Sequence, residues 1–501
     1  MMASKKGTGH GAPPIERTSA EMSNRGALVG RANDILKNNA IRWVQVHFTD
    51  LLGGLRSFTV PVEDLYTGKI WGDGIGFDGA SVKGFAQVEA SDMRAIPDPS
   101  TLSVLRLADG VQPLARVMAE VHNPRTGMRL DSDPRNIAAR AMAHLTRAGF
   151  NEAWISPELE FTIFHSPQDA IVQNDVWNPT SAEGSGHLKV VPELLGEHHP
   201  TSYRSHPASS YFAAPPLDET DPFRNEFAST LHDLGIPVKF HHHENGAGQV
   251  EVELKAMPGP VQMGDACVTY KFLARLVGKR HGLVPTFMPK PVQADSGNGM
   301  HVHLSLWTGG SSAFYDRDDR YHMSQTMRYF IGGLLDHARG TTAITNPTIN
   351  SYKRLVPEYE APVFITWSPV NRTALVRIPA RHAHPDSINC EPRHPDPSAN
   401  PYLVFSILLE SGLDGIRRKI DPGPPVNENV FRMSPERLRE LGIRRLPASL
   451  GVALDEMQSD DLVRRVRGAQ AADSFLELKR REWRTFSNTV STWEHAMYFH
   501  I

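Results

Sequence analysis

The segment His241–Glu253 constrains the fold of this chain more than any other stretch. It reads His-His-His-Glu-Asn-Gly-Ala-Gly-Gln-Val-Glu-Val-Glu, and its flanks, residues 238–242 and 250–254, are typical of short strands joined by a tight turn. Such a turn can bring Glu244 and Glu251 close together, where two carboxylates repel each other unless a cation or a shared proton joins them. The alternative is a polar hairpin with solvated acids, and this segment taken alone favours that alternative.

Two further segments change the balance because they carry the same kind of chemistry. Side chains alternate along an extended chain, so Glu158 and Glu160 share one face of the strand-like segment Ile155–Phe164. By the same rule, His301 and His303 share one face of theirs. Carboxylate oxygens with imidazole suit Mg²⁺ or Mn²⁺, whereas zinc prefers more nitrogen and sulfur. Together the three segments predict a metal site built from several strands of one sheet.

The overall composition narrows the class of protein. The chain has 501 residues, more than one domain usually holds. Its hydrophobic content of 40% and charged content of 22% are those of an ordinary soluble globular protein. A net charge of −3 indicates neither nucleic acid nor an anionic membrane as a partner. The two cysteines, Cys267 and Cys390, make neither a disulfide framework nor a thiolate metal site, which fits a reducing cytoplasm.

We expect an α+β protein with two domains that follow a disordered arm. Residues 1–25 are rich in Gly, Ser, Pro and Lys without an apolar core, so they are expected to be neither a secretory signal nor a membrane span. A small β domain is expected over residues 26–128, and a large domain with an antiparallel sheet and helices over residues 129–501. Helices are predicted at 26–38, 133–149, 222–234 and 260–281, with further helix starts at Ser434 and Ser459, and strands at 43–48 and 56–60.

Nine segments, met in the family's order, give the chain a family resemblance. They are Phe77–Ser81, Pro157–Glu160, Tyr211–Pro216, His243–Glu251, Phe287–Pro291, Gly299–His303, Asn350–Leu355, Asn371–Arg377 and Asn400–Tyr402. Through them the chain resembles glutamine synthetase of the type I, bacterial and archaeal, class, from Trp43 to the C-terminal helices. No single segment is decisive, but nine in sequence make a chance resemblance implausible.

The resemblance implies an architecture and a reaction. The N-terminal domain would be a β-grasp domain, and the catalytic domain would form a funnel from a curved sheet. Two hexameric rings would stack into a dodecamer, with each active site between neighbouring subunits. ATP would phosphorylate the γ-carboxylate of glutamate, and ammonia or an amine would then displace phosphate. Because water attacks acylphosphates readily, the site must exclude it while the amine enters.

The resemblance also assigns two metal ions, Mg²⁺ or Mn²⁺. One ion, near glutamate and the transferred oxygen, would bind Glu160, Glu244 and Glu251, and the other, bridging the ATP phosphates, would bind Glu158, His301 and Glu391. Phosphoryl transfer needs such ions because the charge on the moving group must be neutralised.

The remaining matched positions imply contacts with substrates. Arg354, Arg372 and Arg393 would hold the glutamate carboxylates or the transferred phosphoryl group, which suits the bidentate guanidinium fork. Arg377 and His303 would lie near the nucleotide, and Gly297 near the glutamate α-amino group. Surface ion pairs are a plain alternative for individual arginines.

The nucleophile side of the site is implied in the same way. Asp78, from a neighbouring subunit, and Glu360, on a flap over residues 356–362, would take protons from the nucleophile. The negative pocket for ammonium would be completed by Tyr211, Ser81 and Glu244. Judged from its own loop alone, Asp78 is more typical of a turn in which its side chain bonds the backbone.

Four positions depart from the family pattern. Asn389 stands where an arginine that contacts ATP is expected, which puts in question how the triphosphate is held. Ser296 stands where asparagine usually precedes Gly297, and Glu358 stands where the flap usually has glycine. Phe431 takes the position of a tyrosine that is adenylylated in some bacterial members, so we expect that control to be absent.

These departures keep two other functions open. Relatives of glutamine synthetase join glutamate to methylamine, ethanolamine or polyamines, and Glu358 with Ser296 would suit such a γ-glutamyl-amide ligase. A family member without catalysis is the third possibility; the altered nucleotide segment favours it and the complete metal ligands oppose it. Ammonia as the nucleophile is favoured by the retention of Asp78, Tyr211, Glu244 and Glu360.

Overall fold

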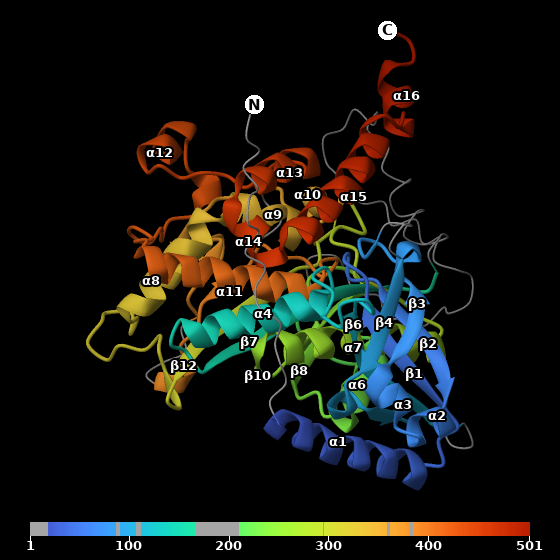
Figure 1. The fold of residues 1–501 in the computed structure, drawn as a ribbon. Coiled ribbons are helices and arrows are strands. Elements are labelled where there is room, and N and C mark those ends of the chain that lie inside the picture. Colours follow the sequence, from blue (N-terminus) through green and yellow to red (C-terminus); the bar gives the residue numbers. More distant parts are fainter. Residues whose placement is uncertain are drawn as a thin grey trace, which may run out of the picture. The chain divides into compact units, whose positions relative to one another are not determined.

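The computed structural model divides into two compact units, whose elements are labelled in Figure 1. It describes residues 19–86, 91–106, 112–166, 210–293, 295–357, 361–379 and 384–501. The first unit consists of Met1–Phe48, Arg56–Ser81 and Gln87–Leu130, and the second of Thr49–Leu55, Val82–Ala86 and Asp131–Ile501. The division at residue 130 lies close to the boundary expected at 128. The assignment of two earlier loops to the second unit has no counterpart in the sequence-based expectation.

The first unit is built on a mixed sheet with the strand order β2-β1-β6-β4-β3, in which β5 pairs with β6. β1 and β6 run parallel and the pairs β3–β4, β4–β6 and β5–β6 antiparallel. The core lies between this sheet and α1, where Ala32 and Leu36 join Val44, Val46 and Val117. The bounds are α1 Ser19–Asn38, β1 Trp43–Thr49, β2 Leu55–Pro61, α2 Val62–Tyr66, α3 Lys69–Asp73, β3 Ile75–Asp78, β4 Asp92–Pro97, β5 Ser103–Leu105 and β6 Leu114–His122.

The start of α1 corrects the prediction of a disordered arm over residues 1–25. The helix begins at Ser19, so residues 19–25 are helical. The Gly- and Pro-rich composition ends before this point, and Ala20, Glu21 and Met22 are good helix formers. Arg25 also ties the helix to the rest of its unit, because its guanidinium donates to the carbonyls of Trp71 and Pro97 at 2.8 Å each.

The second unit contains an antiparallel sheet with the strand order β13-β12-β7-β9-β8, in which β10 and β11 also pair with β7. A second, small sheet has the order β14-β15-β16. The bounds are β7 Glu152–Phe164, β8 Val238–His243, β9 Gln249–Leu254, β10 Met257–Pro258, β11 Val284–Thr286, β12 Met300–Thr308, β13 Ser311–Ser312, β14 Trp367–Ser368, β15 Val376–Arg377 and β16 Glu391–Pro392.

Helices pack against the apolar face of β7, whereas the side chains on its polar face contact those of neighbouring strands. The Phe161 ring makes edge-to-face contacts with Phe227 of α6 (Asp221–Asp233) and Tyr270 of α7 (Gly259–Arg280), at centroid distances of 6.1 and 6.0 Å. Leu159, on the same face as Phe161, is fully buried. Strand alternation then directs Glu158 and Glu160 to the opposite face, as the sequence predicts.

The helices of the second unit pack around α11, which contacts α4, α7, α8 and α9; α4 and α11 run side by side in Figure 1. Asp133 and Ser434 cap α4 and α12 as predicted, whereas the cap of α14 is Asp460 instead of Ser459, because Ser459 still belongs to α13. Within the described ranges, no helix combines the length and apolarity needed to cross a membrane. The bounds are α4 Pro134–Arg147, α6 Asp221–Asp233, α7 Gly259–Arg280, α8 Gln325–Asp336, α9 Ala338–Thr345, α10 Ser351–Arg354, α11 Pro401–Arg418, α12 Pro435–Glu440, α13 Leu450–Ser459, α14 Asp461–Arg467, α15 Ala469–Ser487 and α16 Thr492–Tyr498.

Candidate metal and substrate site

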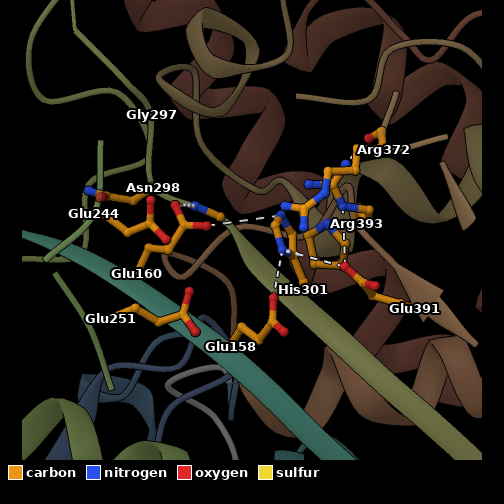
Figure 2. Close-up of polar contacts among 12 residues, drawn as sticks. Glu158, Glu160, Glu244, Glu251, Gly297, Asn298, His301, Arg372, Glu391 and Arg393 are labelled. Carbon is orange, nitrogen blue, oxygen red and sulfur yellow. Dashed lines mark hydrogen bonds and ion pairs between the residues drawn. The ribbon is translucent and has the colours of Figure 1, made fainter. Parts of the chain in front are cut away.

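A row of acids and imidazoles crosses four neighbouring strands of the second unit. Glu251 of β9 is the register partner of both His242 on β8 and Glu160 on β7, and Glu158 of β7 is the partner of His301 on β12. Residues directly opposite each other in neighbouring strands project to the same face. Figure 2 shows the side chains of Glu158, Glu160, Glu244 and Glu251 gathered beside His301. The predicted site across several strands of one sheet is therefore present as a geometric arrangement.

Glu158 is the centre of the first cluster, and an imidazole faces each of its oxygens. His301 Nδ1 lies 2.9 Å from Glu158 Oε2, and His303 Nε2 lies 2.8 Å from Oε1. Glu391, the first residue of β16, brings its Oε1 to 3.7 Å from His301 Nδ1. Burial opposes the charge on Glu158, but the hydrogen bonds from His301 and His303 outweigh burial and hold the pKa of this carboxyl well below its usual range.

The second cluster joins Glu244 and Glu251, as the predicted turn requires. Potential ligand atoms of His242, Glu244 and Glu251 all lie within 4.8 Å of one another. Burial raises the pKa of Glu251 well above its usual range, and the charges of Glu158 and Glu160 raise it further. A carboxylate in this position is costly without a cation nearby.

Glu160 joins the two clusters. Its Oε1 lies 4.0 Å from His301 Nε2, and its Oε2 accepts hydrogen bonds from the Gly299 backbone N–H at 2.8 Å and from Gln249 Nε2 at 3.0 Å. Two donors on one oxygen fix the direction of the carboxylate and leave the other oxygen facing the clusters.

The side chains present fit divalent cations. Five carboxylates and three imidazoles converge, and Glu391 Oε1 is buried with no hydrogen-bond donor among the described residues. An ion pair with Arg393 Nε at 3.2 Å is a partial compensation. Oxygen-rich sets with some imidazole suit Mg²⁺ or Mn²⁺. Cations would relieve the mutual repulsion that raises the pKa of Glu251.

The four predicted arginines differ in their surroundings. Arg377 Nε lies 2.6 Å from Glu391 Oε2, so its guanidinium pairs with a predicted metal ligand. Arg393 pairs with the other oxygen of Glu391 and donates to the carbonyl of Arg372, whose own side chain is exposed. Arg354 is 4% exposed and donates to backbone carbonyls of residues 393–395, at 2.8 to 3.3 Å. Their predicted contacts with substrates stay predictions.

Gly297 and Gly299 lie over Arg354, and a side chain at either position would collide with it. A Cβ atom at Gly299 would be 2.6 Å from Arg354 Nη2, and one at Gly297 would be 2.9 Å from Arg354 Cγ. The two glycines therefore let the chain before β12 approach the buried guanidinium. Gly297 remains a predicted substrate contact.

Tyr211 lies in an aromatic group beside the second cluster. Its ring stacks on Phe212 at a centroid distance of 4.1 Å, and Phe212 meets His242 edge-on at 4.6 Å. Both Tyr211 and Phe212 are exposed. Burial raises the pKa of Tyr211, and the charge of Glu244 adds to the effect.

Asp78 and Ser81 lie in the first unit and contact each other. Asp78 Oδ2 accepts from Ser81 Oγ at 2.5 Å, and Asp78 Oδ1 accepts from the Ala80 N–H at 2.9 Å. The bond from Ser81 and, to a smaller extent, the bond from Ala80 hold the pKa of Asp78 below its usual range. The side chain thus makes the local turn anticipated as the alternative, and its role in catalysis stays a prediction. Glu358 and Glu360 lie outside the described residues.

Gln249 and Asn298 are positioning residues that the sequence did not single out. Gln249 Nε2 donates to Glu160 Oε2, to the Gly297 carbonyl at 3.1 Å and to Asn298 Oδ1 at 3.2 Å. Gln249 carries no charge, but strand alternation places it on the same face as Glu251, two residues later, and this alternation is the signal that could have identified it.

Comparisons with known proteins agree with this fold. Residues 131–498 match the family model of the glutamine synthetase catalytic domain, and residues 40–124 match that of the glutamine synthetase β-grasp domain. The chain is 42% identical over 482 residues to the glutamine synthetase of Archaeoglobus fulgidus, covering 94% of this chain and 98% of the relative. It is 38% identical over 468 residues to that of Thermotoga maritima, covering 93% and 98%.

Solved structures give the same likeness. The chain superimposes on the cryo-EM structure of Plasmodium falciparum glutamine synthetase with a TM-score of 0.80 and 25% identity, covering 95% of this chain and 98% of the other. A GmaS/ADP complex matches with a TM-score of 0.78 and 29% identity, covering 94% and 99%.

A β-grasp domain followed by a catalytic domain with a curved antiparallel sheet defines a class of ATP-dependent carbon–nitrogen ligases. The chain belongs to the glutamine synthetase family and carries that family's glutamate–ammonia ligase domain. The family uses ATP and divalent metal ions.

Proposed function

We propose that this chain makes glutamine from glutamate, ammonia and ATP. An oxygen of the γ-carboxylate attacks the γ-phosphorus of ATP, and the bond to ADP breaks. Ammonia then attacks the γ-carbonyl carbon, loses a proton, and the bond to phosphate breaks. The proposal rests on the row of carboxylates and imidazoles that crosses β8, β9, β7 and β12. The chain's membership of this family supports it further.

Two divalent cations, Mg²⁺ or Mn²⁺, are part of this proposal. When bound, they supply the charge neutralisation that phosphoryl transfer requires. Gln249 and the Gly299 N–H orient Glu160 for this purpose, and Arg377 holds Glu391. The residues that would hold the cations are Glu160, Glu244 and Glu251 for one, and Glu158, His301 and Glu391 for the other.

The arginines and the glycine loop would bind the substrates. Arg354 lies against Gly297 and donates to the backbone carbonyl of Arg393, and we assign these three residues to glutamate. Arg372 has an exposed guanidinium, which suits the transferred phosphoryl group. We assign His303 and Arg377 to the nucleotide side.

Proton transfer from the nucleophile is assigned to two carboxylates, Asp78 and Glu360. In a dodecamer of two hexameric rings, Asp78 and Ser81 would come from a neighbouring subunit, and Tyr211 and Glu244 would complete a negative pocket for ammonium. The mass of the assembly by light scattering tests the ring count. We assign the enzyme to the cytoplasm, in keeping with two buried cysteines that form no disulfide.

The direct test is glutamate-dependent phosphate release from ATP, with ammonium, methylamine, ethanolamine and putrescine offered in parallel and the products identified by mass. Turnover that is fastest with ammonium is the expected result. If a folded protein with bound metal releases no phosphate with any of the four amines, this result would contradict catalysis and support a non-catalytic family member.

Glu360→Ala tests the assigned proton acceptor. The variant should bind ATP and metal as the wild type does and lose most of its amide formation, because one of the two assigned proton acceptors is then missing. Near wild-type product formation would show that the assignment is wrong. Glu436→Ala, on the exposed first turn of α12, is the matched control and should retain activity.

An organic amine is the second candidate nucleophile, and the aromatic group beside Glu244 favours it. Exposed faces of Tyr211 and Phe212 next to a carboxylate would attract an alkylammonium ion as well as ammonium. Preference for methylamine or ethanolamine in the same panel, lost in Phe212→Ala, would establish this candidate.

A further inference from the structure

Two imidazoles meet at the Glu158 cluster, although the family resemblance assigns only His301 to the metal. His301 and His303 project from the same face of β12 and contact different oxygens of Glu158, at 2.9 and 2.8 Å. His303 is 6% exposed. Its Nε2 and the carboxylates of Glu158 and Glu391 offer ligand atoms that all lie within 4.8 Å of one another. The ring of His303 is therefore directed into the cluster.

Asn389 determines which nitrogen of His303 faces the cluster. Asn389 Nδ2 donates to the carbonyl of Ser387 at 3.0 Å, which fixes the orientation of the amide. Its Oδ1 is consequently the atom that lies 2.8 Å from His303 Nδ1, and it accepts a hydrogen bond from that nitrogen. His303 Nε2 donates to Glu158 Oε1 in this structure. Because Asn389 keeps a hydrogen on Nδ1, the Nε2 hydrogen is the one that a cation would displace, and the lone pair of Nε2 would then face Glu158 and Glu391.

The backbone holds Asn389 in this position. Cys390 and Leu304 exchange two hydrogen bonds, from Leu304 N to Cys390 O at 2.9 Å and from Cys390 N to Leu304 O at 3.0 Å. Leu304 directly follows His303 in the sequence, and Cys390 directly follows Asn389. The side-chain contact is therefore positioned by a β-bridge with two backbone hydrogen bonds.

An arginine at residue 389, which the family pattern has, could not make this contact. Guanidinium has five donors and no acceptor, so it cannot receive a hydrogen from His303 Nδ1. Asparagine supplies the missing acceptor. The orientation of His303 is thus a property of this chain that the departure at residue 389 creates.

We propose that His303 Nε2 is a further ligand of the metal ion at Glu158, His301 and Glu391, that Asn389 is its positioning residue, and that the site prefers Mn²⁺ to Mg²⁺. The proposal rests on the proposed function, since it concerns one of the two metal sites assigned there. Mg²⁺ takes oxygen ligands and keeps several waters, whereas a first-row transition ion accepts imidazole nitrogen more readily. Two imidazoles in place of one shift the balance towards Mn²⁺.

Pulsed electron paramagnetic resonance of the full chain loaded with Mn²⁺ counts the nitrogen ligands without using activity. We expect two imidazole couplings at this site in the wild type and the loss of one in His303→Gln. A matched control is His144→Gln, which removes an imidazole that pairs with Glu410 between α4 and α11. Unchanged couplings in His303→Gln, with Mn²⁺ still bound, would overturn the proposal.

Calorimetric titration with Mn²⁺ and Mg²⁺ tests the positioning residue. Asn389→Leu removes the acceptor and should weaken Mn²⁺ binding about tenfold, the lower end of what loss of a partner of a metal-bound histidine costs. Mg²⁺ binding should change less. Asn389→Asp keeps an acceptor and should retain the preference for Mn²⁺. Equal effects of Asn389→Leu on both ions would overturn the role of Asn389.

The two proposals fail in different ways. Suppose that the wild type makes amide and that Glu158→Gln abolishes Mn²⁺ binding at the site of Glu158, His301 and Glu391. If His303→Gln then leaves the nitrogen couplings intact, only the extra ligand is wrong. If Glu158→Gln leaves metal binding unchanged, the metal site itself is wrong, and the extra ligand falls with it.

Discussion

Single side chains decide how the acids of this site are directed. Glu160 is held by one side-chain amide and one backbone N–H, whereas Glu391 is held between two arginines. Neutral and cationic partners thus fix carboxylates that would otherwise turn away from each other. Gln249 is the residue whose removal would isolate this effect, because it carries no charge.

Gln249→Leu should weaken the binding of divalent cations about tenfold, since Glu160 loses one of the two donors that orient it. Some loss of stability should accompany it, because the Gly297 carbonyl loses the Gln249 donor. Calorimetric titration with Mn²⁺ is the measurement. Gln458→Leu, on the exposed side of α13, is the matched control and should bind Mn²⁺ as the wild type does.

The same scale explains how much of the site the sequence could predict. Alternation along a strand depends only on the backbone, so the shared faces of Glu158 with Glu160 and of His301 with His303 could be predicted. The pairing of Glu391 with Arg377 could not be derived from such periodicity, because it depends on the packing of β16 beside β15 and β12. The resemblance supplied Glu391, and the structure brings it to His301.

Among the elements, the contact of α8 with α11 requires the two backbones to approach closely. A Cβ atom at Gly333 would lie 2.0 Å from the Ser411 carbonyl oxygen, and one at Gly415 would lie 2.2 Å from that of Tyr329. The neighbours are backbone atoms, which cannot turn aside. The glycines therefore set the distance between these helices.

Gly415→Ala should lower the free energy of unfolding by about 1–3 kcal/mol or more, through this collision. Thermal unfolding followed by circular dichroism would measure it. Gly30→Ala, in α1, meets nothing within 4 Å and should be neutral or stabilising by up to about 1 kcal/mol. An equal effect of both changes would contradict the explanation.

His337 links α11 to the start of α14 through two acids. Its Nε2 lies 3.0 Å from Asp414 Oδ2 and its Nδ1 2.8 Å from Asp460 Oδ2. Burial opposes the charge on His337, but the hydrogen bonds that its ring donates to Asp460 and Asp414 outweigh burial and raise the pKa of the imidazole. Arg417, Arg418 and Arg465 surround the same Asp414.

The protonated form of His337 should therefore stabilise the fold at low pH. This stabilisation is complete below the unfolded-state pKa of about 6.5 and is lost as the pH rises through the higher folded-state pKa. Urea unfolding across this pH range should show the wild type losing more stability than His337→Gln. His232→Gln, an exposed position on α6, should behave as the wild type does. Parallel pH profiles for wild type and His337→Gln would contradict the assignment.

For the molecule as a whole, the clustered carboxylates oppose folding when no cation neutralises them. Burial and the neighbouring charges of Glu158 and Glu160 both raise the pKa of Glu251. A ligand that binds only the folded state adds about 2.7 kcal/mol of stability at one hundred times its dissociation constant. Stability should thus depend strongly on divalent cations.

Removal of divalent cations with a chelator should lower the melting temperature, and Mn²⁺ should restore it. Glu251→Gln should melt higher than the wild type in chelator, because it relieves repulsion, and gain less from added Mn²⁺, because it has lost a ligand. Differential scanning fluorimetry with and without metal measures both effects. A lower melting temperature of the variant in chelator would show that Glu251 is stabilised by something other than a cation.

For the molecule as a whole, the fold class could be predicted from the sequence, but the contacts between segments distant in the sequence could not. The α+β class followed from strand and helix patterns, and the caps at Asp133 and Ser434 followed from local chemistry. The start of α1 at Ser19 was not predicted, although Ala20, Glu21 and Met22 favour a helix. Arg25 donates to carbonyls of residues 71 and 97, which are distant in the sequence. Composition cannot report such contacts.

The register of β7 with both of its neighbours has a consequence for how this chain can change in length. Glu158 is aligned with His301 on one side, and Glu160 with Glu251 on the other. Adding or deleting one residue in this strand would turn one of these carboxylates towards the aromatic rings of α6 and α7. Natural variants and designed relatives should therefore vary in length in the connecting loops, while the spacing from Glu158 to Phe161 stays constant.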